Sequence, residues 1–379
     1  MAKRVILAVA GAGKTYHICH TIDPSKRNLI LAFTHENIFN IQKELCAAFG
    51  CIPEMTTVTT FDSFVYHYLV LPYEPSIAEH FGFPNFTSHE ISTVAPPPLL
   101  IPKTKRPNPY YVKKDNLKHY ITKNQQYYCA TLSELALQVK QEKDSLIKRS
   151  ANRLNLFFDC ILIDEFQDFR NYDYELIMLL SKQLRDIVLV GDYHQHSVSG
   201  VNNSGKPFKL KNKDINYADF ITHLQKLGFT VDLTTLEKSR RCSSDICRYV
   251  SKKLGIHIES CGINSGSVIW ADRNAQEILE NNHIVKLVNK NSANYTFRAM
   301  NWSYSKGDTV DEACVILTEN LENLDKDTFS ASKLSTVTLN QLYVAMTRCR
   351  GNLYLIKYST FKKLKEQYLC NNSSNATLT

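Results

Sequence analysis

Short apolar runs alternate with amphipathic stretches along the first part of the chain. Residues 5–7 and 28–34 are largely apolar, as expected of strands buried on both faces. Residues 35–49 then place Ile38, Ile41 and Leu45 at helical spacing. Residues 56–64 are rich in β-branched side chains and lead into an aromatic run. Strands alternating with helices predict an α/β fold with a parallel, doubly wound sheet.

This alternation breaks down over residues 72–150. A run of three prolines at 96–98 and a basic, tyrosine-bearing segment at 103–114 interrupt the pattern, and a helix is predicted over 131–148. We expect a small inserted subdomain here. Interleaved basic and tyrosine side chains suit a single nucleic-acid strand, but a solvated loop whose tyrosines pack on the parent domain is an equal alternative.

The alternation then resumes, completes the first domain and predicts a second α/β domain. In the first domain, strands are expected at 157–163 and 186–190, and a polar connection with a helix fills 210–231. We place the first domain at 1–232, the second at 233–365 and a disordered, Asn- and Ser-rich tail at 366–379. Within the second domain, helices are expected at 243–254 and 338–347 and strands at 267–270, 284–288, 313–317 and 352–356.

Composition narrows the class of protein. A length of 379 residues exceeds one ordinary core and favours two domains. The net charge of +8 suits a polyanionic partner without establishing one. The eleven cysteines lack zinc-site spacing and indicate reduced thiols in a cytoplasmic protein. No apolar run approaches the roughly 20 residues that span a bilayer, so no membrane segment is expected.

Residues 8–15, AVAGAGKT, have the order of a phosphate-binding loop between a strand and a helix. Gly11 and Gly13 let backbone N–H groups turn toward an anion at the positive end of a helix. Lys14 would reach the β- and γ-phosphates, and Thr15 would give its hydroxyl to Mg²⁺. A chance Gly/Ala turn and a signal peptide are the alternatives, the latter weakened by an apolar run of only six residues.

Carboxylates follow the next apolar strand. In ILIDEFQD, at 161–168, Asp164 would hold Mg²⁺ and Glu165 would polarise the attacking water. After the strand at 188–190, Gln195 would sense the γ-phosphate or hold that water, although a surface turn residue is the alternative.

Arginines occur in two stretches farther along. A nucleotide held between two domains needs a cation from the far side, and arginine is planar and always ionised. Arg241 lies where the first domain meets the second, and Arg348 lies in the second. For any single arginine in a basic chain, a surface salt bridge is the alternative.

Taken in order, these stretches resemble the motif set of superfamily 1 DNA helicases of the UvrD/Rep type. The resemblance runs from Ala8 to about Leu355 and comprises AGAGKT, AFT, TTFDSF, ILIDEFQD, LVGDYHQ, LEKSRR, YSKGDTVDEACVIL and YVAMTRCR. It implies two RecA-like P-loop NTPase domains that hydrolyse ATP with Mg²⁺ in the cleft between them while moving 3′–5′ on single-stranded DNA.

The resemblance also assigns roles to individual residues. It implies catalysis by Lys14, Asp164, Glu165, Gln195, Arg241 and Arg348, Mg²⁺ ligation by Thr15 and Asp164, nucleotide binding by Gly11, Ala12, Gly13, Lys14, Thr15, Arg240 and Gly307, and nucleic-acid contact by Phe33, Thr34, Phe61, Ser63 and Lys306.

Several positions depart from the family pattern. The glutamine segment that reads adenine is not seen before the phosphate loop, so base specificity stays open. Arg240 replaces a tyrosine but can still stack on a base. His196 and residues 197–201 replace an aromatic residue and an arginine, and Thr309 replaces an acidic residue that contacts ribose. The second domain carries almost no insertion, so translocation is expected rather than processive unwinding.

Two hypotheses of different class follow. The first is an ATP-dependent DNA translocase or helicase. The second is a nucleotide-gated module that senses DNA or recruits a nuclease or other partner protein, with ATP hydrolysis as a timer. RNA stays open as the strand, because the expected contacts are to backbone and base faces.

Overall fold

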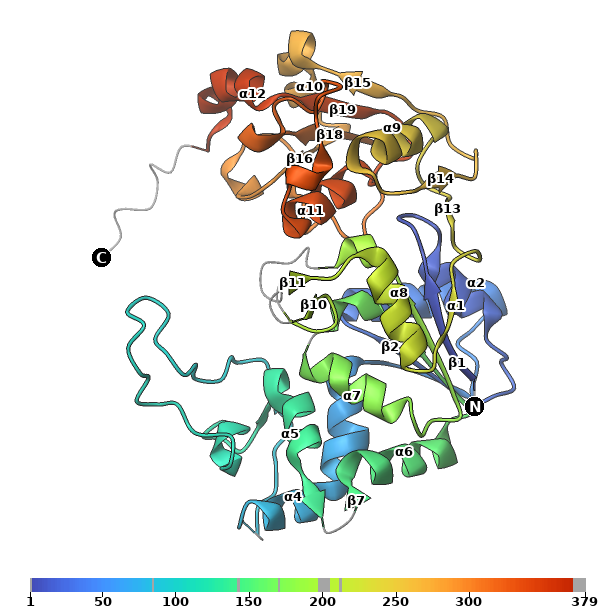
Figure 1. Ribbon diagram of the computed structural model, residues 1–379, viewed down its shortest axis with the longest axis vertical. Helices are drawn as coiled ribbons and strands as arrows, with labels where there is room; N and C mark the ends of the chain where they lie inside the picture. The colour runs from blue at the N-terminus through green and yellow to red at the C-terminus, as the bar shows by residue number, and fades with distance from the viewer. Residues whose placement is uncertain are drawn as a thin grey trace.

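Two parallel β-sheets organise the chain, one in each half of the computed structural model (Figure 1). The structure describes residues 2–83, 85–141, 144–169, 171–196, 205–210 and 213–370. None of the helices in these ranges combines the length and the apolar character needed to cross a membrane. The predicted α/β fold with parallel sheets is confirmed.

The first sheet has six strands in the order β12-β1-β9-β8-β2-β3, and all neighbours are parallel. The strands are β1 (Ala2–Leu7), β2 (Asn28–Ala32), β3 (Thr56–Thr60), β8 (Cys160–Ile163), β9 (Asp186–Gly191) and β12 (Thr230–Asp232). Successive side chains point to opposite faces, so Val5 and Leu7 join one core cluster and Ile6 joins another. Helices therefore cover both faces of the sheet.

The two faces carry different helices. Helices α1 (Lys14–Thr21) and α2 (His35–Phe49) pack on the face of Ile6. The opposite face is covered by α5 (Leu132–Gln138), α6 (Leu146–Phe157), α7 (Tyr172–Leu180) and α8 (Tyr217–Lys226). Helix α2 begins where the Thr34 side chain accepts a hydrogen bond from the Asn37 N–H and ends at Gly50 in the left-handed conformation.

The second sheet has five parallel strands in the order β15-β19-β18-β16-β17. They are β15 (Val268–Trp270), β16 (Ile284–Val288), β17 (Ala299–Asn301), β18 (Glu312–Ile316) and β19 (Leu353–Ile356). Helices α9 (Ser244–Leu254) and α11 (Thr336–Met346) pack on one face, and α10 (Ala275–Glu280) and α12 (Tyr358–Leu364) on the other. The elements predicted for this half of the chain are confirmed.

A long excursion leaves the first domain between α4 (Glu74–His80) and α5 and extends away from the body (Figure 1). Its paired strands are β4 (Ile91–Ser92) and β5 (Tyr127–Tyr128). Other short pairs lie outside it: β6 (Lys140–Gln141) with β7 (Asp144–Ser145), after α5, β10 (Lys209–Leu210) with β11 (Lys213–Asp214), and β13 (Lys238–Ser239) with β14 (Glu259–Ser260). Leu132 and Leu135 of α5 return to the core of the parent sheet.

The single helix predicted over 131–148 is wrong. Helix α5 ends at Gln138, because Val139 adopts an extended backbone, and α6 begins separately where Ser145 accepts from the Lys148 N–H. The strand predicted over 56–64 ends at Thr60, whose hydroxyl caps the short helix α3 (Phe61–Phe64). Likewise β8 starts only at Cys160, since α6 continues to Phe157.

The disordered tail predicted from residue 366 starts too early. Tyr368 is buried against the second-domain core, with its ring centroid 5.5 Å from that of Phe297. Its hydroxyl donates a hydrogen bond to Glu280. Residues 371–379 lie outside the described residues.

Candidate nucleotide site between the two domains

The loop after β1 turns tightly at two glycines. Gly11 and Gly13 have φ values of 72° and 88°, in the left-handed region that favours glycine. A Cβ at Gly11 would lie 2.5 Å from the Cβ of Arg241, so a side chain there would clash with the segment that enters the second domain. Gly13 precedes α1 without a side-chain cap, which leaves the first N–H groups of that helix available to an anion.

Two carboxylates lie at the carboxyl end of β8. Asp164 is 1% exposed, and its Oδ2 accepts a hydrogen bond of 2.8 Å from the Thr15 hydroxyl. Glu165 has a φ of 54° and forms an ion pair with Lys14, with 3.1 Å between Nζ and Oε1. Side-chain contacts therefore join the loop directly to the strand end.

Burial and neighbouring charge separate the pKa values of these groups. Burial, reinforced by Glu165, raises the pKa of Asp164 to about 6. Burial acts in the same direction on Glu165, but Lys14 and Lys306 outweigh it and lower its pKa to about 2. Burial also opposes the charge of Lys14, yet the carboxylates of Glu165, Asp192 and Asp164 raise its pKa. Glu165 is thus the more readily ionised carboxyl of the two.

The donor set fits a magnesium ion. The Thr15 hydroxyl and the Asp164 carboxylate are hard oxygen ligands held side by side next to the phosphate loop. Mg²⁺ commonly uses one or two such protein oxygens, with water and substrate phosphate completing the shell. Within the described residues, no group of three His, Cys, Asp or Glu side chains forms a dedicated metal cluster.

The carboxyl end of β9 carries a second polar group. Gln195 is buried, and its Nε2 donates to Asp192 Oδ2 at 2.8 Å. The hydroxyl of Tyr343, from α11 of the second domain, donates to the same carboxylate and accepts from the Ala10 N–H at 2.8 Å. Sequence reasoning missed Tyr343, because nothing local in α11 distinguishes it from a core tyrosine.

The second domain faces this edge with cations. Arg241 Nη1 donates to the Thr347 carbonyl at 3.1 Å. Arg348 is buried, and its Nε and Nη1 donate to the carbonyls of Val344 and Ser305 at 2.8 and 3.1 Å. Its Nη2 has no partner among the described residues. Burial, followed by repulsion from Arg241, lowers the pKa of Arg348 to about 9, which leaves it charged at neutral pH.

These groups line one cavity of about 160 Å³ between the domains. The structure brings together most of the residues predicted for nucleotide chemistry, and it adds Tyr16, Asn37 and Asn40, which the sequence reasoning missed. The predicted residues that line the cavity are Gly11, Gly13, Lys14, Thr15, Asp164, Glu165, Gln195, Arg241, Gly307 and Arg348.

A second cavity, of about 290 Å³, lies on the outer side of the phosphate loop. Arg240 and Ala12 line it, together with Tyr16 of α1. The Arg240 guanidinium lies 5.4 Å from the centroid of the Tyr16 ring, and that ring stacks on His20 at 3.8 Å. Two flat groups in contact with each other therefore line a cavity next to the predicted phosphate site.

The residues predicted to contact nucleic acid separate into two groups. Phe33 is 40% exposed and Thr34 is exposed, and Ser63 is half-buried. For the side chain of Phe61 the prediction is wrong: it is 1% exposed and packs edge-on against Phe169 at 4.5 Å. A ring enclosed in the core cannot stack on a base.

Other predicted contacts lie elsewhere. Lys306 is directed into the cleft, where its Nζ lies 2.6 and 2.7 Å from the two carboxylate oxygens of Asp168. His196 is buried and stacks on Phe208 at 3.9 Å. Residues 197–201, where a base-stacking contact was expected to be missing, lie outside the described residues.

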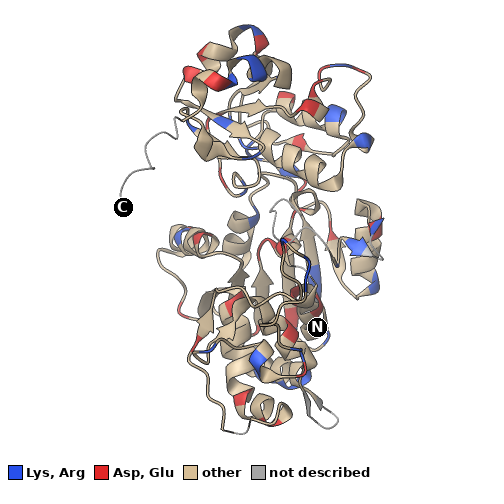
Figure 2. Ribbon diagram, turned by 90° about the vertical axis from the view of Figure 1, so that its left-hand side faces the viewer, with Lys and Arg blue, Asp and Glu red and all other residues tan. Residues whose placement is uncertain are grey.

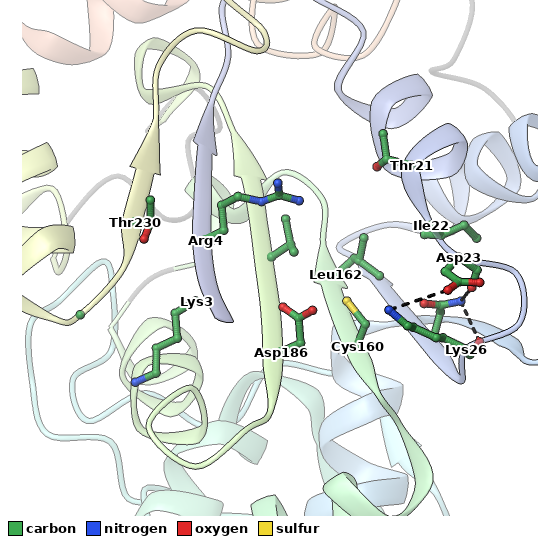
Figure 3. A pocket seen from close by; sticks show the side chains of 13 residues that line it. Lys3, Arg4, Thr21, Ile22, Asp23, Lys26, Cys160, Leu162, Asp186 and Thr230 are labelled. Atoms are coloured by element: carbon green, nitrogen blue, oxygen red, sulfur yellow. Dashed lines mark hydrogen bonds and ion pairs between the residues drawn. The ribbon is translucent and has the colours of Figure 1, made fainter. Parts of the chain in front are cut away.

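A third cavity, of about 500 Å³, is lined by none of the residues predicted for nucleotide chemistry (Figure 3). It lies at the amino ends of the strands, on the opposite edge of the first sheet from the phosphate loop. Lys3, Arg4, Cys160, Asp186 and Thr230 are among its lining residues.

Comparison with known proteins places the chain in a family. Residues 2–201 match the family model described as AAA domain, and the chain belongs to this family. No curated protein matches it.

Solved structures with a similar fold include two viral proteins. Nonstructural protein 10, a helicase of an arterivirus solved with DNA, is 12% identical, with a TM-score of 0.44 over 96% of this chain and 63% of that one. The helicase of PRRSV is 14% identical, with a TM-score of 0.43 over 96% of this chain and 54% of that one. The chain spans 63% of the length of the first of these proteins and 54% of the second.

Proposed function

Because the chain belongs to the AAA domain family, we propose that it hydrolyses ATP and uses the energy to move on single-stranded DNA, as a superfamily 1 translocase or helicase of the UvrD type. One observation carries the proposal. The phosphate-loop lysine and the two carboxylates of the first domain line the same 160 Å³ cavity as two arginines of the second. A nucleotide bound there makes hydrolysis depend on how the domains sit together.

The groups of the first domain bind the phosphates and orient water. When a nucleotide binds, Lys14 leaves its ion pair with Glu165 and binds the phosphate oxygens instead, because a triphosphate carries more negative charge than one carboxylate. Thr15 and Asp164 would hold Mg²⁺, which would supply positive charge beside the phosphate oxygens. Glu165, ionised by its cationic neighbours, then orients the attacking water and accepts its proton.

The groups of the second domain complete the site. Arg241 and Arg348 supply the positive charge that a phosphoryl transition state requires on the side opposite Lys14. The unpartnered Nη2 of Arg348 is a donor still available to the phosphate. Gln195, held by Asp192, places an amide beside the same cavity.

Tyr16 and Arg240 bind the base in our proposal. Both are planar groups at the 290 Å³ cavity beside the phosphate loop, and stacking between a ring and a guanidinium needs no particular base edge. The nearby hydroxyls of Thr234 and Thr235 already donate to Asp232, so they are poorly placed to read a base. We therefore expect weak discrimination among nucleoside triphosphates.

The excursion from the first domain supports a polyanionic partner. Between Ile91 and Lys114 the chain carries five Lys or Arg residues and no Asp or Glu. Tyr110 is 75% exposed, whereas Tyr111 packs edge-on against His119 at 5.7 Å between centroids. Elsewhere Lys and Arg are distributed over both domains (Figure 2). A basic segment with an exposed tyrosine suits the phosphates and bases of a single strand.

The direct test is ATP hydrolysis measured in parallel without nucleic acid and with single-stranded DNA, duplex DNA and RNA. We expect the largest stimulation by single-stranded DNA. A rate that is the same in all four conditions would contradict the proposal.

A second function is favoured by the apolar part of the same excursion. Leu99, Leu100 and Ile101 are exposed on a segment held by backbone hydrogen bonds from Ile101 to Arg106 and from Asn108 to Leu99. Exposed aliphatic side chains of this kind suit a protein surface. The chain would then be a nucleotide-gated DNA sensor that recruits a nuclease or another protein. ATP-driven displacement of a labelled strand by the purified chain alone would exclude this alternative.

A further inference from the structure

Lys306 joins the two domains across the cleft. It lies in the loop between β17 and β18 of the second domain, and Asp168 ends the 3₁₀ turn η5 (Phe166–Asp168) of the first. The Lys306 ammonium lies 2.6 Å from Asp168 Oδ1 and 2.7 Å from Oδ2. It also lies 3.6 Å from Glu165 Oε2. One side chain thus contacts two carboxylates of the other domain.

The loop that carries Lys306 is firmly held in its own domain. Trp302 is buried and donates from Nε1 to the Leu287 carbonyl of β16 at 2.9 Å. The Ser305 hydroxyl donates to the Trp302 carbonyl at 2.8 Å, and the Ser305 carbonyl accepts from Arg348 Nη1. The loop that carries Lys306 is therefore hydrogen-bonded to Arg348, so a movement of either residue displaces the other.

Asp168 is held just as closely to Glu165. The Asp168 N–H donates to the Glu165 carbonyl at 2.9 Å, which closes the turn that follows β8. Glu165 itself sits in the left-handed conformation at the start of this turn. Its carboxylate forms ion pairs with Lys14 and Lys306 and accepts a hydrogen bond from the Gln167 side chain. A displacement of Asp168 is therefore expected to shift both the backbone and the carboxylate of Glu165.

The ammonium of Lys306 has little capacity left for another partner. A lysine has three N–H donors, and the distances account for two on Asp168 and direct the third toward Glu165. The side chain is only 17% exposed. A nucleic-acid phosphate, the partner expected from the sequence, would have to displace two carboxylates to reach it.

We propose that Lys306 and Asp168 form a positioning pair that aligns Glu165 for hydrolysis only while the two domains are together. The inference rests on the proposed ATPase function. Separation of the domains breaks the pair and leaves Glu165 with Lys14 and Gln167 alone. The position of Glu165, like that of the two arginines relative to the phosphates, thus depends on domain closure.

The test is a double-mutant cycle on the full chain, with kcat and KM for ATP measured at saturating single-stranded DNA. Lys306→Met and Asp168→Asn should each lower kcat by about 10- to 100-fold while KM changes little, because a small misalignment of a reacting group is costly. The double variant should lose no more than either single one, since both remove the same contact. Lys306→Arg should restore most of the rate.

Two further measurements separate this role from simpler ones. The affinity for single-stranded DNA should be unchanged in Lys306→Met, and Lys333→Met, at an exposed lysine of the same domain, should match the wild type in every assay. Thermal unfolding should show that all variants are folded.

The outcomes are distinct. Additive losses, an unchanged kcat, or weakened DNA binding with an intact rate at saturating DNA would each overturn the pair. A wild-type protein that hydrolyses no ATP under any condition would overturn the proposed function, and the pair with it.

Discussion

The two sides of the cleft are built from opposite charges. The first domain contributes three carboxylates, the buried Asp164 and Asp192 and the partly buried Glu165, at the ends of two neighbouring parallel strands. The second contributes the cations Arg241, Lys306 and Arg348 from loops and a helix end. Lys14 of the phosphate loop is the cation that the first domain places among its own carboxylates. Neither side alone has equal numbers of positive and negative side chains at the cleft.

The two sides also differ in what holds their side chains. The carboxylates follow strands of a sheet that is covered on both faces, so their backbone is fixed within one domain. The arginines donate to carbonyls of their own domain, such as Val344 and Thr347, and the Nη2 of Arg348 has no partner among the described residues. We infer that the first side binds the phosphates and activates the water, and that the second side adds its transition-state charge only while the domains are together.

The largest effects are expected on the first side. Glu165→Gln should abolish hydrolysis, because an amide cannot accept the proton of water, while nucleotide binding persists. Lys14→Ala should abolish both, since it removes the phosphate cation. Binding of a fluorescent ATP analogue, measured beside single-turnover hydrolysis, separates the two variants.

Full hydrolysis by Glu165→Gln would show that another group activates the water. A Lys14→Ala variant that binds nucleotide with unchanged affinity would move the phosphates away from this loop. Lys26→Ala, an exposed lysine beyond α1, is the matched control and should behave as wild type.

Variants of the second side should leave binding largely intact. Arg241→Ala and Arg348→Ala are each expected to lower kcat by about 10³-fold, as for other arginines that stabilise phosphoryl transfer. Lysine should not replace either arginine, because it lacks the planar set of donors. Hydrolysis measured at saturating nucleotide checks this expectation.

Because Arg348 is buried, its variants need a control for folding. Circular dichroism and thermal unfolding of Arg348→Lys provide one. A folded Arg348→Ala variant with the wild-type rate would remove this residue from the site and weaken the contrast between the two sides.

A moderate effect on the KM for ATP is expected for Tyr16, which we propose to bind the base. Tyr16→Ala should raise KM for ATP by about 10-fold with little change in kcat, because stacking on a base contributes about 1–3 kcal/mol. Tyr16→Phe should match the wild type. Hydrolysis of tripolyphosphate, which has no base, should be unaffected by either change, and an equal loss with both substrates would contradict a role in base binding.

The smallest expected effect is a dependence of stability on pH at the domain boundary. His194 contacts Tyr217 and Tyr343, and burial lowers its pKa to about 4. Its neutral form is favoured in the folded protein, so its contribution to stability is complete above about pH 6.5 and is lost as the pH falls toward 4. His194→Gln should flatten that decline by about 1–3 kcal/mol, measured by denaturant unfolding at several pH values. An identical slope in the variant would contradict the assignment.

Much of the fold could be predicted because local patterns decided it. Apolar runs of strand length and helical spacing located most strands and helices of both sheets. The errors occurred where short-range hydrogen bonds override composition. Thr60 ends a β-branched strand by capping α3, and Ser145 starts a new helix inside a stretch that reads as one.

The phosphate loop, the carboxylates after β8 and the arginines of the second domain are apparent in the sequence by itself, because each depends on a short pattern of residues next to a strand or a helix. The partners of these residues could be known only from the tertiary structure. Tyr343 meets Ala10 across 333 positions of sequence, and Lys306 meets Asp168 across 138. Phe61 faces the core although its motif suggested a surface contact. Such contacts depend on how two separately folded sheets approach each other, and no local pattern of residues specifies that distance.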